Sequence, residues 1–112
     1  MSRPGPCAAV FLGLIAAGLA LPAWADTDFT LTIHNHKYEP TDLTVPANTK
    51  VKLVVKNLAP TPETFESFDL TREKVVGPGG RIEVFVGPLA PGKYEFFGDF
   101  HQDTARGHLI AQ

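Results

Sequence analysis

Apolar and polar residues alternate with a period of two along most of the chain, and this pattern predicts β-strands. The alternation is clearest at residues 29–34, 51–56 and 81–86, and it resumes at 93–97 before the closing run 109–111. After the leading apolar segment, no window sustains the 3.6-residue period of an amphipathic helix. The sequence therefore predicts an all-β protein.

Turn-forming sequences separate the alternating segments at short intervals. Three of them are Pro46-Ala47-Asn48, Gly77-Pro78-Gly79-Gly80 and Pro91-Gly92. Roughly six to eight short strands with such separators, and no helices, are typical of a β-sandwich. We place a single domain at residues 26–112, a length that leaves no room for a second one.

Residues 1–25 have the pattern of a secretory signal peptide. Arg3 precedes an almost unbroken apolar run from Ala8 to Leu21, and Ala23-Trp24-Ala25 is a small-any-small cleavage sequence. The run is shorter than the ~20 apolar residues of a membrane span. We therefore expect cleavage after Ala25, a periplasmic location and no direct membrane anchor. Cys7 lies before the apolar run, whereas a lipoprotein cysteine follows it, so Cys7 leaves with the leader.

The charge of the chain limits its possible partners, and its cysteine content limits what can stabilise the fold. The chain has 10 basic and 12 acidic residues, a net charge of −2, without a basic stripe. Nucleic acid is therefore not an expected partner. Cys7 is the single cysteine, so the secreted domain cannot form an internal disulfide although its compartment would permit one. We expect its stability to come from core burial, with help from a bound metal.

Several short segments of the predicted domain resemble those of a known family. Over nearly all of residues 26–112 the chain is similar to cupredoxin-like domains. The segments that carry the resemblance are Tyr38-Glu39-Pro40, Val51-Lys52-Leu53, Asn57, Pro91-Gly92-Lys93-Tyr94, His101 and Gly107. The resemblance implies a cupredoxin-like Greek-key β-sandwich that carries a metal site at one end of its sheets.

A narrower resemblance concerns bacterial periplasmic iron-uptake systems. The chain is similar to the cupredoxins of Efe-type and Ftr-type ferrous iron systems, and its size matches the stand-alone Ftr-type domain better. The segments concerned are Phe65-Glu66-Ser67, Glu73-Lys74-Val75-Val76, Phe96-Phe97-Gly98-Asp99-Phe100 and Thr104-Ala105-Arg106-Gly107. This resemblance implies periplasmic or membrane components of an iron permease as partners.

The sequence departs from the blue-copper members of the family at the sulfur ligands. Gly98 stands where the family pattern places the cysteine thiolate, and Arg106 stands near the expected methionine. Met1 is the single methionine and leaves with the leader. Because soft sulfur ligands select copper and set its redox potential, the resemblance carries over the position of a site and not blue-copper electron transfer.

Two glutamates compete for the position of the family's first metal-binding histidine. Glu66 is in phase with Phe68 and Leu70, so it takes that position if those two residues face the core. Glu63 is the competing alignment, although a solvated strand position fits Glu63 better than Glu66. His101 keeps the position of the family's histidine in the last loop, so the resemblance places it first among the candidate ligands.

Asp99 and Asp103 lie two residues to either side of His101 and complete this candidate set. Carboxylates with imidazole suit Fe(II), Mn(II), Zn(II) or Cu(II), and they suit Cu(I) poorly. The alternative is that both aspartates cap turns through side-chain to backbone hydrogen bonds. Arg106 can form an ion pair with either aspartate or contact a partner.

Three further histidines and one glutamate are weaker candidates. His34 and His36 are two residues apart, so on a regular strand they face the same side, where Glu39 could join them in a second surface site. A solvated outer face is the simpler interpretation for this pair. His108 follows the last loop closely and joins the main site only if it points toward the end of the sheet.

These residues predict a periplasmic protein that binds a transition metal, Cu(II) and/or Fe(II), and acts as an accessory in ferrous iron uptake. The iron role is implied by the resemblance, and a ferroxidase-type activity stays open because the sequence does not reveal an electron path. Two alternatives remain: a Cu(II) carrier that delivers to another periplasmic protein, and a metal-free interaction module that kept the fold and lost the site.

Overall fold

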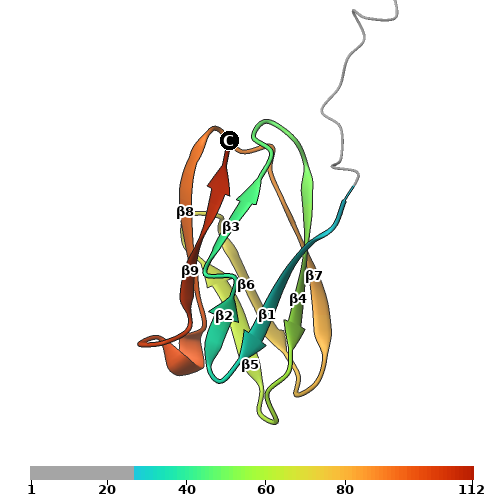
Figure 1. Cartoon of the computed structure of the whole chain (residues 1–112), viewed down its shortest axis with the longest axis vertical. Helices are drawn as coiled ribbons and strands as arrows, with labels where there is room; N and C mark the ends of the chain where they lie inside the picture. The colour runs from blue at the N-terminus through green and yellow to red at the C-terminus, as the bar shows by residue number, and fades with distance from the viewer. Residues whose placement is uncertain (1–26) are drawn as a thin grey trace, which may run out of the picture.

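The computed structural model describes residues 27–112, so the predicted signal peptide and its cleavage site lie outside the described residues. Within this range the chain forms nine strands and one short 3₁₀ turn (Figure 1). The elements are β1 Phe29–His34, β2 Lys37–Glu39, β3 Asp42–Val45, β4 Val51–Asn57, β5 Glu63–Ser67, β6 Arg72–Val76, β7 Arg81–Val86, β8 Gly92–Phe97, η1 Asp99–His101 and β9 Arg106–Ala111.

The strands form two sheets that pack face to face, as the alternation predicted. One sheet has the order β2-β1-β4-β7 and the other the order β3-β9-β8-β5-β6. The pairs β1 with β4 and β3 with β9 are parallel, and the remaining pairs are antiparallel. The prediction of a single all-β, cupredoxin-like sandwich is confirmed. No helix within residues 27–112 has the length and apolar character needed to cross a membrane.

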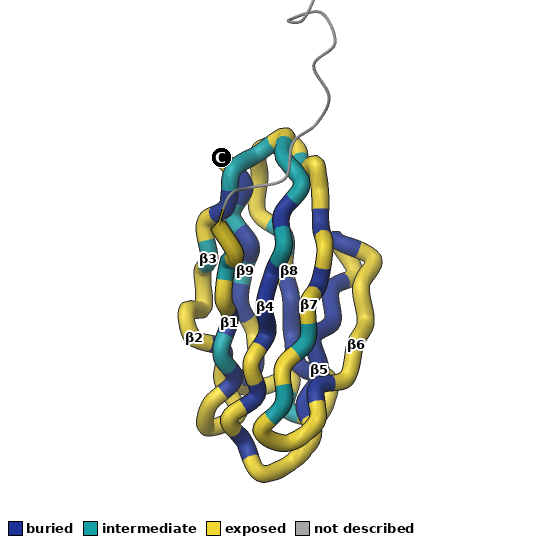
Figure 2. The backbone as a smooth tube through the Cα atoms, turned by 90° about the vertical axis from the view of Figure 1, so that its right-hand side faces the viewer, coloured by how far each residue is buried: buried dark blue, intermediate teal, exposed yellow. Residues whose placement is uncertain are grey.

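The core lies between the sheets, where the buried positions of both layers face each other (Figure 2). In β1, Leu31 and Ile33 are buried, while Thr30, Thr32 and His34 are more exposed, which is the period of two seen in the sequence. Three buried aromatic rings fill the centre. The ring of Tyr38 meets those of Phe65 and Phe96 edge-on, with centroids 6.3 and 4.8 Å away, a favourable aromatic geometry.

The β1–β2 connection corrects the prediction that His34 and His36 share one strand face. Strand β1 ends at His34, which pairs with Lys37, and the two residues between them have φ values of 53° for Asn35 and 58° for His36. A two-residue connection with both φ values positive is a type I′ hairpin turn. Because the alternation stops at the turn, His36 points away from the outer face of β1.

The environment of β5 corrects two further expectations. All five of its residues are buried, and Glu63 is fully buried rather than solvated. The condition for the Glu66 alignment, that Phe68 faces the core, is not met, because β5 ends at Ser67 and Phe68 in the following turn is 84% exposed. Leu70 is buried as expected. Strand β5 thus brings a buried carboxylate to the end of the sandwich that holds η1.

Candidate metal centre

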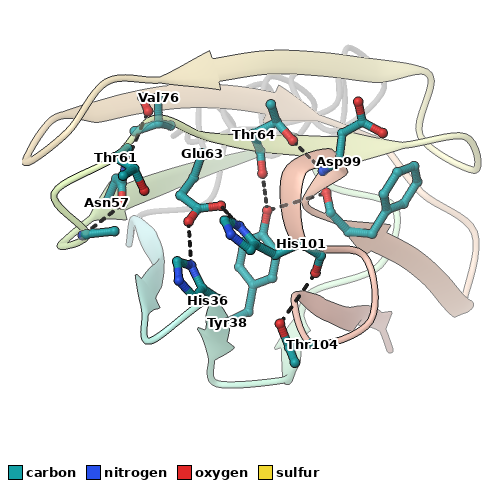
Figure 3. A network of polar contacts seen from close by, with 12 residues as sticks. His36, Tyr38, Asn57, Thr61, Glu63, Thr64, Val76, Asp99, His101 and Thr104 are labelled. Atoms are coloured by element: carbon teal, nitrogen blue, oxygen red, sulfur yellow. Dashed lines mark hydrogen bonds and ion pairs between the residues drawn. The ribbon is translucent and has the colours of Figure 1, made fainter.

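Three segments that are distant in sequence meet at one end of the sandwich and bring His36, Glu63 and His101 together (Figure 3). His36 comes from the β1–β2 turn, Glu63 begins β5, and His101 ends η1. One potential ligand atom from each residue lies within 4.8 Å of the others. The two sheets and the last loop each supply one member of this cluster, which we call the His–Glu–His cluster.

The carboxylate of Glu63 holds both imidazoles by their Nδ1 atoms. Its Oε2 lies 3.1 Å from Nδ1 of His36, and its Oε1 lies 3.1 Å from Nδ1 of His101. The Glu63 side chain is 0% exposed, whereas those of His36 and His101 are 47% and 31% exposed. The cluster is therefore closed on the carboxylate side and open to solvent on the imidazole side.

The two imidazole rings stack on each other, with centroids 3.6 Å apart and planes inclined by 19°. A metal–imidazole bond lies in the plane of the ring, because the nitrogen lone pair does. One ion cannot lie in both planes of a nearly parallel stack at this separation. Metal binding therefore requires at least one ring to turn, and the χ2 torsion of histidine is soft enough to allow it.

The donor set fits a divalent transition metal once a ring has turned. Before any ring turns, each imidazole Nδ1 lies 3.1 Å from one oxygen of Glu63, so small side-chain movements suffice to bring the three donors to metal–ligand distances of ~2.0–2.2 Å. Two imidazoles with one carboxylate are the ligand set of non-haem Fe(II) sites that keep open positions. The cluster contains no sulfur donor, so it is poorly matched to Cu(I).

Hydrogen bonds between the Asn57 side chain and nearby backbone groups position the start of β5, where Glu63 lies. The Asn57 side chain is buried; its Nδ2 donates to the carbonyls of Thr61, Val76 and Gly77, and its Oδ1 accepts from the Ala59 amide. These bonds fix the loop that leads from β4 into Glu63. A single buried amide thus sets where β5 begins.

The cluster is tied to the neighbouring strands through Tyr38 and Thr64. The Tyr38 hydroxyl donates to the Thr64 carbonyl at 2.6 Å, and the Asp99 amide donates to Thr64 Oγ1 at 2.6 Å. Burial raises the pKa of Tyr38 well above its ordinary range, and the charges of Glu63 and Glu66 add to the effect. The phenol therefore stays protonated and remains a donor.

The carboxylate that contacts His101 belongs to Glu63, the competing alignment, and not to Glu66. Glu66 is buried, its Oε2 accepts a hydrogen bond from Thr64 Oγ1, and it lies directly opposite Glu73 on β6. Burial is the main cause that raises the pKa of Glu66; the neighbouring Glu73 and Asp99 raise it further, and the bond from Thr64 opposes them. Glu66 is absent from the His–Glu–His cluster.

The aspartates flanking His101 are exposed. Asp99 accepts a hydrogen bond from the Gln102 side chain at 2.7 Å, and η1 has no side-chain cap at its start. Neither Asp99 nor Asp103 belongs to the His–Glu–His cluster. Arg106 pairs with Glu95, at 3.2 Å, rather than with either aspartate, and its guanidinium lies 5.5 Å from the centre of the Phe97 ring.

The remaining candidates form separate surface pairs. His34 lies 3.5 Å from Glu39, and His108 lies 3.4 Å from Asp42, with all four side chains about half exposed or more. Each is one histidine beside one carboxylate, and neither pair belongs to a group of three or more candidate metal donors among residues 27–112. These pairs provide matched controls for the His–Glu–His cluster.

Position 98 shows how the site differs from one with a thiolate. Gly98 has an ordinary extended backbone, with φ −106° and ψ 122°, so its conformation does not require glycine. A Cβ added there would lie 3.1 Å from the Cβ of Ala105 and 4.0 Å from Oε1 of Glu63. The missing side chain leaves room for close packing of the last loop beside the carboxylate.

His36 is the member of the cluster that the sequence analysis did not place in the main site; it assigned His36 to the same strand face as His34. The signal that could have separated it from His34 is Asn35, because asparagine is favoured at positive φ in type I′ turns. The contact between His36 and Glu63 spans 27 residues, so local periodicity carries no information about it.

Two packed sheets with candidate metal donors at one end define a β-sandwich with a candidate metal centre. The chain belongs to the cupredoxin-like domain family, whose model matches residues 7–111. An uncharacterized protein of Rickettsia prowazekii (strain Madrid E) is 52% identical over 80 residues. The match covers 71% of this chain and 64% of that protein, so the chain spans less than two thirds of the length of this relative.

Solved structures with a similar fold include amicyanins. Amicyanin from Paracoccus versutus superposes with a TM-score of 0.63 and 17% identity, covering 79% of this chain and 84% of amicyanin. A reduced amicyanin mutant gives a TM-score of 0.65 at 17% identity, covering 79% and 85%. A Cu(I) form of another amicyanin mutant gives 0.63 at 18% identity, with the same coverage. At these identities the likeness establishes the fold alone.

Proposed function

We propose that this protein binds one divalent transition metal ion at the His–Glu–His cluster. The observation that carries the proposal is the fully buried Glu63 carboxylate, each of whose oxygens faces one imidazole nitrogen at 3.1 Å. A buried charge with two potential ligands from other segments is costly to maintain, and a functional ion explains why the chain maintains it. The oxygen and nitrogen donors favour Fe(II) or Cu(II) over Cu(I).

We further propose that the metal is iron and that the protein is a periplasmic accessory of ferrous iron uptake. Support comes from the two-imidazole, one-carboxylate donor set, which is typical of Fe(II) sites, and from the resemblance to iron-uptake cupredoxins. Because both imidazoles are partly exposed to solvent, an ion bound to them keeps free coordination positions on that side. A permease component can deliver or receive the ion there. Delivery of Cu(II) to another protein is the competing role for the same donors.

Metal titration tests the binding proposal. Protein purified without a tag or chelator is titrated anaerobically with Fe(II), and separately with Cu(II) and Mn(II), by calorimetry. Glu63→Gln, His36→Ala and His101→Ala should each weaken binding by more than the roughly 10–100-fold that loss of an orienting partner costs. The controls His34→Ala and His108→Ala remove histidines from the isolated surface pairs and should bind as the wild type does. Equal binding by all five variants would overturn the proposal.

Uptake measurements test the iron role separately. Deletion of the gene in its native bacterium should lower uptake of radioactive Fe(II) and leave copper tolerance unchanged. The opposite pattern would favour the Cu(II) carrier. Oxidation is a further step in which Fe(II) gives one electron to copper or dioxygen, and comparing Fe(III) formation with and without air measures it.

A metal-free interaction module is the second candidate function, and one observation favours it. In the described structure each oxygen of Glu63 already has an imidazole partner, so the network is satisfied without an ion. Wild-type protein that binds none of the three metals, yet keeps its fold, would establish this alternative.

A further inference from the structure

The hydroxyl group of Tyr38 lies where the segments that carry the His–Glu–His cluster converge (Figure 3). Tyr38 is 1% exposed, and its hydroxyl donates to the Thr64 carbonyl at 2.6 Å. The Phe97 carbonyl lies 3.5 Å from the same oxygen. One hydroxyl therefore reaches strands β5 and β8 from β2, which belongs to the opposite sheet.

Each of these contacts is close in sequence to one member of the cluster. Tyr38 follows His36 by two residues, and Thr64 is adjacent to Glu63. Phe97 immediately precedes Gly98, whose carbonyl accepts the backbone hydrogen bond of the His101 amide at 3.2 Å. A shift of β2 relative to β5 would therefore move His36 away from Glu63.

Strand pairing between β5 and β8 is sparse beside the His–Glu–His cluster. Strands β5 and β8 have a single registered pair, Glu66 with Phe97, whereas β8 and β9 are paired along their whole length. No strand of the opposite sheet forms ladder hydrogen bonds with β5 among the described residues. The hydroxyl is thus a direct polar link between the sheets beside the cluster.

The aromatic ring of Tyr38 has a separate role from its hydroxyl. The ring packs against Phe65 and Phe96 in the core, and a phenylalanine at this position would keep that packing. The hydroxyl contributes a directed bond, and its cost of burial is offset only because it has an acceptor.

We infer that the Tyr38 hydroxyl is a positioning group for the His–Glu–His cluster, because it fixes the β1–β2 turn against β5 and so holds His36 at Glu63. The inference rests on the proposed metal-binding function for its consequence in affinity. Its geometric content, the placement of His36, holds for the metal-free protein as well.

The test compares Tyr38→Phe with Tyr94→Phe in the full chain. Tyr94 is a matched control, because its hydroxyl donates to the Ala90 carbonyl at 2.7 Å and lies at the other end of β8, away from the cluster. Both variants lose one tyrosine hydrogen bond to a backbone carbonyl. Tyr38→Phe should weaken Fe(II) and Cu(II) binding by about 10–100-fold, and Tyr94→Phe should leave binding within a factor of about three of the wild type.

A readout on the metal-free protein separates this inference from the proposed function. Ring nitrogen signals in histidine NMR report the Nδ1 contacts of His36 and His101 without any metal. Tyr38→Phe should change the His36 signals, and Tyr94→Phe should not. If the wild type binds no metal, the proposed function fails and these signals alone decide the inference. If Tyr38→Phe resembles Tyr94→Phe in both readouts and loses only thermal stability, the role is structural and the inference is overturned.

A rescue variant guards against loss of the fold. Incorporation of 4-aminophenylalanine at position 38 retains the ring and an N–H donor toward the Thr64 carbonyl. It should restore the wild-type His36 signals and metal affinity. If Tyr38→Phe does not fold, the amino variant carries the test alone, and altered His36 signals in a folded amino variant would overturn the inference.

Discussion

Removal of one imidazole from the His–Glu–His cluster should measurably destabilise the metal-free protein. Either His36→Ala or His101→Ala leaves one oxygen of the fully buried Glu63 without its hydrogen bond. A hydrogen bond to a charged group contributes about 1.5–3 kcal/mol, and the partial exposure of both rings favours the lower end of that range. Loss of the van der Waals contact between the two five-membered rings adds about 0.5–1 kcal/mol, at ~0.1–0.2 kcal/mol for each pair of facing ring atoms. We therefore expect each variant to lower the free energy of unfolding by about 2–3 kcal/mol.

The double variant provides a sharper test, because the stack is shared. Each single substitution removes the whole ring stack, whereas the double variant loses it once. The cost of the double variant should therefore be smaller than the sum of the single costs by about 0.5–1 kcal/mol, the contact energy of the two rings. Urea unfolding at pH 7 with a chelator present measures all three values.

His34→Ala is the control for this cycle, since it removes a histidine outside the cluster that pairs with the exposed Glu39. Its effect should stay within about 0.5 kcal/mol. If His36→Ala and His101→Ala are as mild as this control, the buried carboxylate does not depend on the imidazoles. Strict additivity in the double variant would refute the energetic role of the stack.

Three further predictions concern other parts of the molecule. Burial raises the pKa of Glu66, so ionisation of this side chain lowers the stability of the fold as the pH rises through that pKa. Glu66→Gln should therefore stabilise the protein at pH 7 by about 0.2–1 kcal/mol, as relief of a like-charge cross-strand pair does. Urea unfolding should show this gain disappearing at about pH 4, where free glutamate is largely protonated. Gly107→Ala should destabilise by at least about 1–3 kcal/mol, because its Cβ would overlap the Thr41 carbonyl and the Phe96 ring; a thermal melt unchanged from the wild type would contradict this. A Cu(II) complex of protein lacking the leader should be pale, since without a thiolate it has no intense absorption near ~600 nm, as visible spectroscopy can establish.

The fold was predictable because it depends on local patterns. Residues 29–34 alternate in the sequence, and in the structure Leu31 and Ile33 face the core. The turn sequences at 46–48 and 77–80 also lie between strands, as their glycine, proline and asparagine content indicated, and Pro91 directly precedes β8, which begins at Gly92. The sheet order and the two parallel pairs were not predicted, because alternation says which face of a strand is buried and not which strand is its neighbour.

The candidate site was less predictable, since its contacts join distant segments. The resemblance identified the end of the sandwich and the position of His101, but the phase argument for Glu66 assumed that β5 continues through Phe68. The strand ends at Ser67, and the first residue of β5, Glu63, takes the position beside His101 instead. The location of His36 depends on the backbone conformation of one turn. Two positive φ values there redirect its side chain from the surface to the carboxylate.

The geometry at position 98 shows how a thiolate there would affect the Glu63 carboxylate. A Cβ at residue 98 would lie 4.0 Å from Oε1 of Glu63 and 3.1 Å from the Cβ of Ala105. A thiolate extending from that Cβ would bring a second negative charge close to the buried Glu63 carboxylate. Like charges at such a separation in a poorly solvated place repel strongly. Glycine at position 98 and glutamate at position 63 are therefore compatible with each other, and together they replace a soft donor by a hard one at the same end of the fold.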